Sequence, residues 1–328
     1  MEKTYYLNQL IKRREFRFDR LELKGIDNAP VKRMFGSEMT EQEASLFHCD
    51  VACGDEYFEI LQNFIYEGMV KKESAPVVRI ADGEYAFYAY SLECNGLYQQ
   101  AESVQAIKDI MPTHIKALRI LSRIGKLAPL IFPGNVQHKR KSFFKKSNVN
   151  DTALRFIDFL FNNKIELTRS NYIPFYVVYA YLTSDRFCKM MDGKSLCIIG
   201  SEYHKDFCRK WFRRCSSHPN IHFTKIPEHF VATQWPSIKE RILKQIPPDL
   251  DLCLVGAGIG SLLVCVDVAY EFSVPAVDAG HVLNMMNGRE EKSEGARLYT
   301  IRETRQSNSL KLERNAHERS FEKVSKEI

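Results

Sequence analysis

The sequence predicts an α/β fold with a Rossmann-like, mostly parallel sheet and helices on both faces, an N-terminal helical extension and a C-terminal tail. From residue 192 onward, short β-branched apolar segments alternate with amphipathic ones. Strands that alternate with helices of about 10–15 residues indicate parallel βαβ units. The 328 residues include only 16 Gly and 12 Pro, which argues against a turn-dense all-β protein.

The first half of the chain contains fewer clear elements. Residues 1–35 are basic and have no period, whereas 38–70 predict a helix, with a capping box at Thr40 and Glu43. We then expect a buried strand at 75–80, a helix over 101–128, a strand at 130–132, a helix over 151–163 and a short strand at 165–170.

The second half predicts three βα pairs and a closing strand. Strands are expected within 192–202, 221–227, 249–258 and 274–282, with helices over 204–215, 235–246 and 259–272. These elements suggest three regions: an N-terminal basic and helical extension (1–75), a catalytic domain (76–285) and a charged C-terminal tail (286–328).

The composition indicates which partners and which cellular compartment to expect. The net charge of +6 suits an anionic small molecule or a loose membrane-surface contact better than nucleic acid. Nine cysteines without a CxxC pattern favour a reducing, cytoplasmic location. The start of the chain lacks the apolar core of a signal peptide. The uncharged stretch Leu252–Val266 is shorter than the roughly 20 residues that span a bilayer.

Two carboxylates follow the strand predicted at 75–80. Because residues i and i+2 of a strand face the same way, we expect Asp82 and Glu84 to present two carboxylates to one side, with Gly83 keeping the space between them open. Two hard oxygen ligands suit Mn²⁺ or Mg²⁺, with a substrate diphosphate completing the shell. Arg79 could bind the phosphates as a planar fork. A plain surface loop with two solvated acids is the other interpretation.

A glycine-rich turn follows the strand predicted at 249–258. Gly256, Gly258 and Gly260 precede a helix, and Asp278 lies 22 residues beyond Gly256, where a Rossmann unit places its ribose-binding acid. The spacing is GxGxG rather than GxGxxG, and little chain remains to complete a nucleotide-binding half. The turn could bring backbone N–H groups to a phosphate, or could serve only helix–sheet packing.

Two further groups follow predicted strands. Asp278 and His281 pair a carboxylate with an imidazole, which could act as a base, a metal ligand or a ribose contact, or as an N-cap and a surface histidine. Arg169 could hold a diphosphate or be a surface charge. Weaker candidates are Glu202, His204, Glu228 and His229.

Taken in order, these motifs resemble the GT-D fold glycosyltransferases, a family with a DxE motif. The resemblance covers roughly 76–284. It rests on the Arg79–Glu84 segment, Leu97-Tyr98-Gln99, Thr168-Arg169-Ser170, the strand Lys194–Gly200, the glycine turn with its helix, and Asp278–His281. Differences lie at Ser170-Asn171, where the family has proline after the arginine, at Ser201–His204 and at Glu228–Ala232.

The resemblance implies a metal-dependent enzyme that uses nucleotide sugars, typically UDP-sugars, to assemble bacterial surface or adhesin glycans. Asp82 and Glu84 would hold Mn²⁺ or Mg²⁺. Donor-binding residues would be Arg79, Gly83, Gln99, Arg169, Gly256, Gly258 and Asp278, with His281 as a phosphate contact or base. The acceptor would be a glycan, a lipid-linked sugar or a protein.

Two other functions remain open on the sequence. A Rossmann-type NAD(P)- or S-adenosylmethionine-dependent enzyme would use residues 256–278 and leave the carboxylates unexplained. A non-catalytic sugar-nucleotide binding module would not need Asp82 and Glu84. Separately, the basic loop His138–Lys146, which includes Phe143 and Phe144, is expected to give weak, salt-sensitive contact with the inner membrane face, unless it is an ordinary surface loop.

Overall fold

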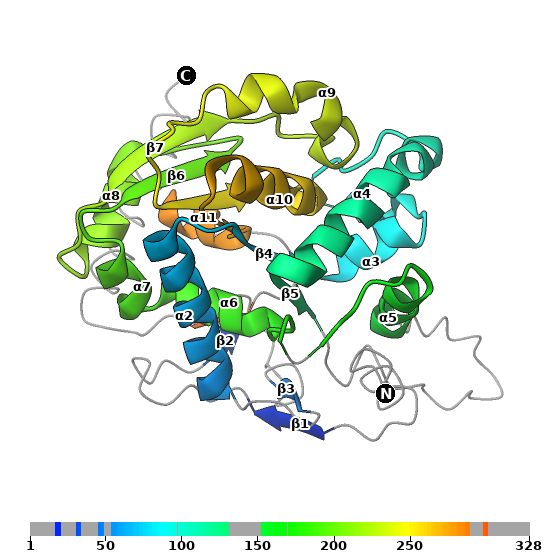
Figure 1. Ribbon diagram of the computed structural model, residues 1–328, viewed down its shortest axis with the longest axis horizontal. Coiled ribbons are helices and arrows are strands. Elements are labelled where there is room, and N and C mark those ends of the chain that lie inside the picture. Colours follow the sequence, from blue (N-terminus) through cyan, green and yellow to red (C-terminus); the bar gives the residue numbers. More distant parts are fainter. Residues whose placement is uncertain are drawn as a thin grey trace, which may run out of the picture.

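The centre of the protein is a six-stranded parallel sheet with the strand order β5-β4-β9-β8-β6-β7 (Figure 1). The computed structural model describes residues 17–20, 31–33, 45–48, 54–96, 98–130, 152–168, 170–288 and 298–300. The strands are β4 (Ala75–Ile80), β5 (Lys126–Pro129), β6 (Ser195–Gly200), β7 (Asn220–Lys225), β8 (Leu252–Gly256) and β9 (Pro275–Asp278). The predicted α/β class with a mostly parallel sheet is confirmed.

Helices cover both faces of this sheet, as Figure 1 shows. One face carries α4 (Val104–Ile124), α9 (Val231–Leu243) and α10 (Ser261–Phe272), which contact one another. The other carries α2 (Gly54–Lys71), α6 (Phe175–Thr183), α7 (Asp185–Met190) and α8 (Lys205–Arg213). Every residue of β4 and β9 is therefore buried, which explains their nearly continuous apolar sequences.

Shorter elements complete the fold. They are α3 (Asp82–Tyr88), α5 (Thr152–Asn162), α11 (His281–Met286) and the 3₁₀ turns η1 (Leu92–Cys94) and η3 (Gly258–Gly260). Two small antiparallel pairs join β1 (Arg17–Arg20) to β3 (Ser45–His48), and β2 (Val31–Arg33) to β10 (Leu298–Thr300).

The strand order reverses between β6 and β8. β6 leads outward to β7, whereas β8 leads the opposite way to β9. Gly200 and Gly256, the last residues of β6 and β8, are Cα partners at this point. Open α/β sheets bind ligands outside the carboxyl ends of their strands, near such a reversal. The functional site is therefore expected at the edge where β4, β9, β8 and β6 end.

Three predictions in the first half of the chain were wrong in part. The helix expected over 38–70 begins only at Gly54, and 45–48 form β3. The capping box at Thr40 lies outside the described residues. The helix expected over 101–128 ends at Ile124, because residues 126–129 pair with β4 as β5, earlier than the strand expected at 130–132.

Residues 165–168 do not form the strand expected there. The side chain of Asn171 forms hydrogen bonds with backbone groups that would otherwise pair with a neighbouring strand. Its Oδ1 accepts from Thr168 N at 2.7 Å, and its Nδ2 donates to Glu166 O at 2.8 Å. The backbone of Asn171 and Ile173 instead bonds to Leu127 of β5. An Asn side chain that competes with regular pairing is a common cause of such loops.

The helix α2 shares its core with the sheet. It contacts α6, β4 and β9, and Tyr57, Phe58, Leu61 and Ile65 on it are fully buried. This stripe follows the helical period, and its burial provides most of what holds a surface helix in place. In the part of the chain that the structure describes, no helix has both the length and the apolar character needed to cross a membrane.

Candidate functional site

The structure brings Arg79 and Asp278, two residues predicted for the site, into direct contact at the ends of β4 and β9. Arg79 Nη2 lies 2.9 Å from Asp278 Oδ1, and Arg79 Nε donates to the backbone oxygen of Asp278 at 2.9 Å. The backbone N–H of Arg79 donates to Asp278 Oδ2 at 3.3 Å. Both residues are buried, with 8% and 4% of their surface exposed. The pair fixes the edge of the sheet where the two strands end.

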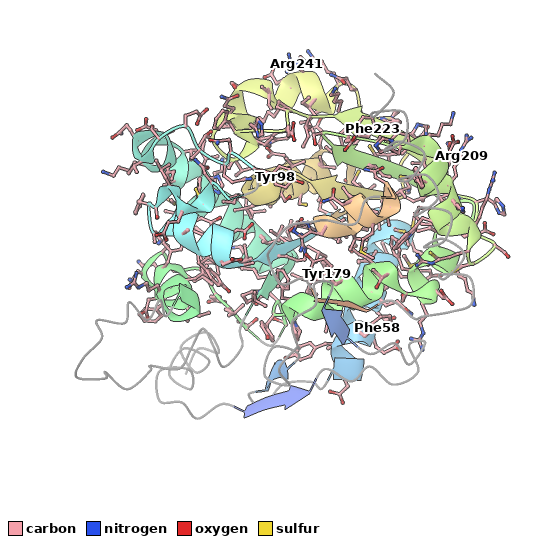
Figure 2. All side chains as sticks on the ribbon, turned by 180° about the vertical axis from the view of Figure 1, so that it is seen from behind. Phe58, Tyr98, Tyr179, Arg209, Phe223 and Arg241 are labelled. Carbon is pink, nitrogen blue, oxygen red and sulfur yellow. The ribbon has the colours of Figure 1, made fainter. Side chains whose placement is uncertain are left out.

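Aromatic rings of α6 enclose the guanidinium of Arg79. Its carbon lies 4.6 Å from the ring centre of Tyr179 and 5.2 Å from that of Phe175, and Nη1 donates to the Tyr179 hydroxyl (Tyr179 is labelled in Figure 2). Burial alone would lower the pKa of Arg79, but Asp278 and Tyr179 raise it above its ordinary value. The charge of Arg79 is thus permanent and fully engaged inside the fold.

Gly280 is required by this arrangement. Its φ of +45° lies in the left-handed region that glycine adopts readily. A Cβ atom at this position would collide with Nη2 and Cζ of Arg79. The chain after β9 can therefore pass close to the guanidinium only because residue 280 has no side chain.

The expectation that Asp82 and Glu84 lie on one face of a strand was wrong, because both belong to the first turn of α3. Residues two apart in a helix point in different directions. Asp82 is exposed, whereas Glu84 is half-buried and its Oε2 accepts from Ala81 N at 2.9 Å. Glu84 thus forms half of a capping box at the start of α3, without a polar side chain at the N-cap residue Ala81.

Glu84 is electrostatically linked to the Arg79–Asp278 pair. Burial raises the pKa of Glu84 to about 7, and the nearby negative charge of Asp278 acts in the same direction. The N–H of Ala81 and the charge of Arg79 oppose this shift. A carboxylate with such a pKa is half protonated near neutral pH, and a divalent cation bound to it would favour the ionised form.

A metal at this site would need ligands beyond the protein. Among the described residues, no three His, Cys, Asp or Glu side chains lie together as a complete metal site. Mg²⁺ and related ions are commonly held by one or two carboxylates together with waters and substrate phosphates. Asp82 and Glu84, both in the first turn of α3, carry oxygens of the type that this second pattern uses.

The glycine turn after β8 is organised by Gln100, whereas the sequence pointed to its neighbour Gln99. Gln100 Oε1 accepts from Ile259 N at 2.9 Å, and a Cβ at Gly258, where φ is +54°, would lie 2.6 Å from that oxygen. Gln99 is exposed. A second N–H of the turn, that of Ala257, donates to Ser261 Oγ at 3.1 Å.

The other residues predicted for the site lie at the end of β8, at the start of α11, in α3, or outside the described residues. Gly256 ends β8, and a Cβ there would lie 2.7 Å from Leu283 Cδ1 of α11. His281 is half-buried and begins α11, three residues after Asp278. A Cβ at Gly83 would meet nothing within 4 Å. Arg169 lies outside the described residues.

A carboxylate–imidazole pair, only a weak candidate on the sequence, lies beyond the end of β6. His204 Nε2 is 2.9 Å from Glu202 Oε1. The buried side chain of Asn287 fixes this loop, because its Oδ1 accepts from His204 N at 2.9 Å and its Nδ2 donates to Glu202 O at 3.2 Å. The residues Tyr179, Gln100 and Asn287 were not found from the sequence, since each acts through contacts with distant segments.

Residues 147–286 match the family model of the GT-D fold-like domain. This segment is similar to that domain. The resemblance suggested by the motifs is confirmed, and the match supports a glycosyltransferase. It includes the glycine turn, Asp278 and His281, whereas Asp82 and Glu84 precede it.

Two solved structures are also similar, each with 18% identity and a TM-score of 0.43. One is described as a selenomethionine-substituted structure of domain of unknown function 1792, and the match covers 75% of this chain and 91% of that one. The other description states that this domain has a distinct glycosyltransferase fold, with 74% and 85% covered. No curated protein matches the chain significantly.

Proposed function

We propose that the protein is a metal-dependent glycosyltransferase that moves a sugar from a UDP-sugar to a glycan, glycolipid or protein acceptor in bacterial surface-glycan assembly. The observation that carries this proposal is the match of residues 147–286 to the family model of the GT-D fold-like domain. The cluster formed by Glu84, Arg79 and Asp278 lies at the strand ends where α/β enzymes bind their ligands, and supports the same function.

Asp82 and Glu84 would hold Mn²⁺ or Mg²⁺ on the donor diphosphate. A bound metal would stabilise the negative charge that develops on the leaving phosphate. Glu84 must be ionised to take part, and its pKa of about 7 makes this step sensitive to pH near neutrality. A Cβ at Gly83, between the two acids, would meet no atom within 4 Å.

The other residues expected to bind the donor would have different roles in the site. Arg79 contributes mainly by fixing Asp278, since its guanidinium is engaged by that carboxylate and by Tyr179. The nucleotide side of the site would be formed by Gly256, Gly258 and Asp278, with Gln99 and Arg169 as further donor contacts.

Two histidines are candidates for proton transfer from the acceptor hydroxyl. His281 follows Asp278 directly along the chain. His204 has a carboxylate partner, Glu202, which could orient the imidazole and stabilise its protonated form. A pH-rate profile of variants at each position would separate the two.

The glycine turn gives less support to the NAD(P)- or S-adenosylmethionine-dependent alternative. Its backbone N–H groups at Ala257 and Ile259 already donate to Ser261 and Gln100. A pyrophosphate cradle requires such groups to be directed at the ligand. Because these two N–H groups are already hydrogen-bonded within the protein, we favour a sugar nucleotide held by a metal over a dinucleotide held by the turn.

The experiment that tests the function is a thermal-shift comparison of UDP, GDP, NAD and S-adenosylmethionine, each with and without Mn²⁺. A ligand at 100 times its Kd adds about 2.7 kcal/mol to the free energy of unfolding. We expect UDP to stabilise the protein and Mn²⁺ to enlarge the effect. Stabilisation by NAD that does not depend on metal would exclude the proposal.

Variants of the two acids then test the metal site. Asp82→Asn and Glu84→Gln should each abolish sugar transfer and the Mn²⁺-dependent part of the UDP shift. Asp82→Asn should change the free energy of unfolding by about 1 kcal/mol or less, and Glu84→Gln should keep the fold. Gln at position 84 can still accept from Ala81 N, so the helix start is retained. Full transfer activity in either variant would contradict the metal assignment.

The proposed location is the cytoplasmic face of the membrane, with weak peripheral contact through the basic loop His138–Lys146. This loop lies outside the described residues. Binding to anionic vesicles that weakens at high salt, and that is lost when Lys139, Arg140, Lys141, Lys145 and Lys146 are changed to Gln, would support it.

A further inference from the structure

The loop that follows β6 carries a polar pair and an aromatic ring at the carboxyl edge of the sheet. Residues 201–204 lead from the end of β6 into α8. Within this loop, His204 Nε2 lies 2.9 Å from Glu202 Oε1. The ring of Tyr203 stacks on that of Phe223 in β7, with 5.1 Å between the ring centres (Phe223 is labelled in Figure 2). The three loop residues are half-buried, so each presents part of its surface to solvent.

This loop lies on the same edge of the sheet as the Arg79–Asp278 pair. The helix α11 connects the two places, because it begins at His281, three residues after Asp278, and ends next to Asn287, which bonds to His204 N. A helix of six residues is about 9 Å long. The loop is therefore about one short helix away from the proposed donor site.

The buried side chain of Asn287 holds the loop through its backbone. Its Oδ1 accepts from His204 N at 2.9 Å and from Cys208 Sγ at 3.3 Å, and its Nδ2 donates to Glu202 O at 3.2 Å. These bonds do not involve the side chains of Glu202 and His204. The carboxylate and the imidazole are thus presented by a fixed backbone that does not depend on them.

The second nitrogen of His204 has no partner in the part of the chain that the structure describes. A neutral imidazole that donates from Nε2 to Glu202 carries its lone pair on Nδ1. The side chain of His204 is 41% exposed, so a ligand can approach it. An imidazole nitrogen with a lone pair can accept a hydrogen bond, and then a proton, from a hydroxyl group.

We propose that this loop is the acceptor subsite, which binds a sugar ring with a free hydroxyl group; the inference rests on the function proposed above. The apolar face of the sugar packs against the ring of Tyr203, and the hydroxyl donates to His204 Nδ1. Binding sites for small molecules commonly combine aromatic surface with a few convergent polar groups. Tyr203 supplies the aromatic surface here, and Glu202 with His204 supplies the polar groups.

The subsite assigns the proton of the transfer reaction. The acceptor oxygen forms a bond to the anomeric carbon of the donor sugar, and the bond from that carbon to the diphosphate breaks, so that its electron pair leaves with UDP. The hydroxyl proton moves to His204 Nδ1. Glu202 stabilises the imidazolium that forms, as a carboxylate does beside a catalytic histidine. His204 then returns the proton to water.

A second carboxylate–imidazole pair provides a matched control. His218 Nδ1 lies 3.8 Å from Asp192 Oδ1, and both side chains are exposed. His218 precedes β7, so this pair lies near the amino ends of the parallel strands, at the opposite edge of the sheet. Tyr66 on α2, which is 53% exposed, is the corresponding control for Tyr203.

The first test measures sugar binding without transfer. Saturation-transfer NMR is applied to the full chain with UDP and Mn²⁺, and the probes are the methyl glycosides of glucose, galactose and N-acetylglucosamine. We expect saturation of at least one glycoside by the wild type. The signal should be lost in Tyr203→Ala, retained in Tyr203→Phe and unchanged in Tyr66→Ala, with circular dichroism to check that each variant is folded.

The second test measures UDP release from UDP-glucose and UDP-N-acetylglucosamine in the presence of the glycoside that binds. A general base contributes about 100-fold or more, so His204→Ala should lower kcat by that factor with little change in the KM for the glycoside. Added imidazole should restore part of the rate. His218→Ala should behave like the wild type. His204→Ala tests the site even if Tyr203→Ala does not fold, since the loop backbone does not depend on this side chain.

The outcomes separate the subsite from the proposed function. A protein that UDP and Mn²⁺ stabilise but that saturates no glycoside would overturn the subsite and leave the donor site. Glycoside binding that Tyr203→Ala does not change would place the sugar elsewhere, and an unchanged kcat in His204→Ala would exclude this histidine as the base. Glycoside binding that needs Tyr203, without UDP release by the wild type, would contradict the transfer reaction and the proton step but not the sugar site.

Discussion

Arg79 of β4 and Asp278 of β9 are joined by three hydrogen bonds inside the fold. The bonds use the backbone as well as the side chain of each residue, so they fix the ends of the two strands relative to each other. Tyr179 ties α6 to the same guanidinium. This pair is thus a structural support for the edge of the sheet where we place the donor.

We predict that Asp278→Asn lowers the free energy of unfolding by roughly 3 kcal/mol. The substitution leaves the buried Arg79 charge without its carboxylate, and breaking a buried ion pair from one side has costs of this size. Urea unfolding measures the loss.

Glu67→Gln is the matched control for this change. Glu67 pairs with Lys71 at 2.7 Å, but both side chains are more than half exposed. Exposed i, i+4 pairs contribute little to stability, because solvent screens the two charges. Equal losses in the two variants would mean that burial does not increase the contribution of the Arg79–Asp278 pair to the free energy of unfolding.

We predict that the stability of the protein depends on pH through Glu84. The pKa of Glu84 is raised to about 7 in the folded protein, above its ordinary value of 4.5. Between these values the folded state binds more protons than the unfolded state, so the stability due to Glu84 falls as pH rises from 4.5 to 7. Metal binding should strengthen over the same range, because it needs the ionised carboxylate.

Urea unfolding at pH 5 and pH 8, with and without Mn²⁺, measures both effects. The difference between wild type and Glu84→Gln should isolate the fall in stability, since the variant cannot ionise at this position. Stability of the wild type relative to Glu84→Gln that rises with pH in the absence of metal would contradict the raised pKa.

Gly280→Ala and Gly83→Ala should have opposite effects on stability. Ala at 280 would adopt an unfavourable positive φ and collide with Arg79, with an expected loss of about 3 kcal/mol. Ala at 83 would meet no atom within 4 Å and lies in the first turn of α3. Replacing a helical Gly by Ala stabilises by up to about 1 kcal/mol. Thermal melts of the two variants measure the contrast, and a stable Gly280→Ala would show that Arg79 can move.

The sequence predicted the second half of the chain well, because each strand there is a short apolar run followed by an amphipathic helix. It failed at the end of β4, where the helix α3 begins directly after the strand. The N-cap residue there is Ala81, which is not among the residues that mark a helix start. Asp82 and Glu84 were therefore placed on a strand.

Partners far apart in sequence were not predictable for a different reason. Tyr179 lies within an apolar run and carries no local sign that it contacts Arg79, 100 residues away. The choice between Gln99 and Gln100 depends on a turn that Asn95 organises, since its Oδ1 accepts from the backbone N–H of Gln100 at 2.6 Å and of Ala101 at 2.9 Å. Such tertiary contacts have no periodic signature.

We predict that Gln99 and Gln100 differ in their contributions to stability. Gln100→Ala removes the acceptor of the buried Ile259 N–H and opens a gap beside Gly258. A buried donor left without a partner costs about 1–3 kcal/mol, so we expect a loss of roughly 2 kcal/mol in the free energy of unfolding.

Gln99→Ala, at an exposed side chain, should change stability by less than about 0.5 kcal/mol. Urea unfolding of both variants, together with calorimetric measurement of UDP binding, shows whether each glutamine supports the glycine turn or contacts UDP directly. Because Gln100 holds the glycine turn, its loss should weaken UDP binding together with stability. Weaker UDP binding by Gln99→Ala at unchanged stability would instead identify Gln99 as a direct donor contact. If Gln100→Ala left stability unchanged, the glycine turn would have to be held by other contacts.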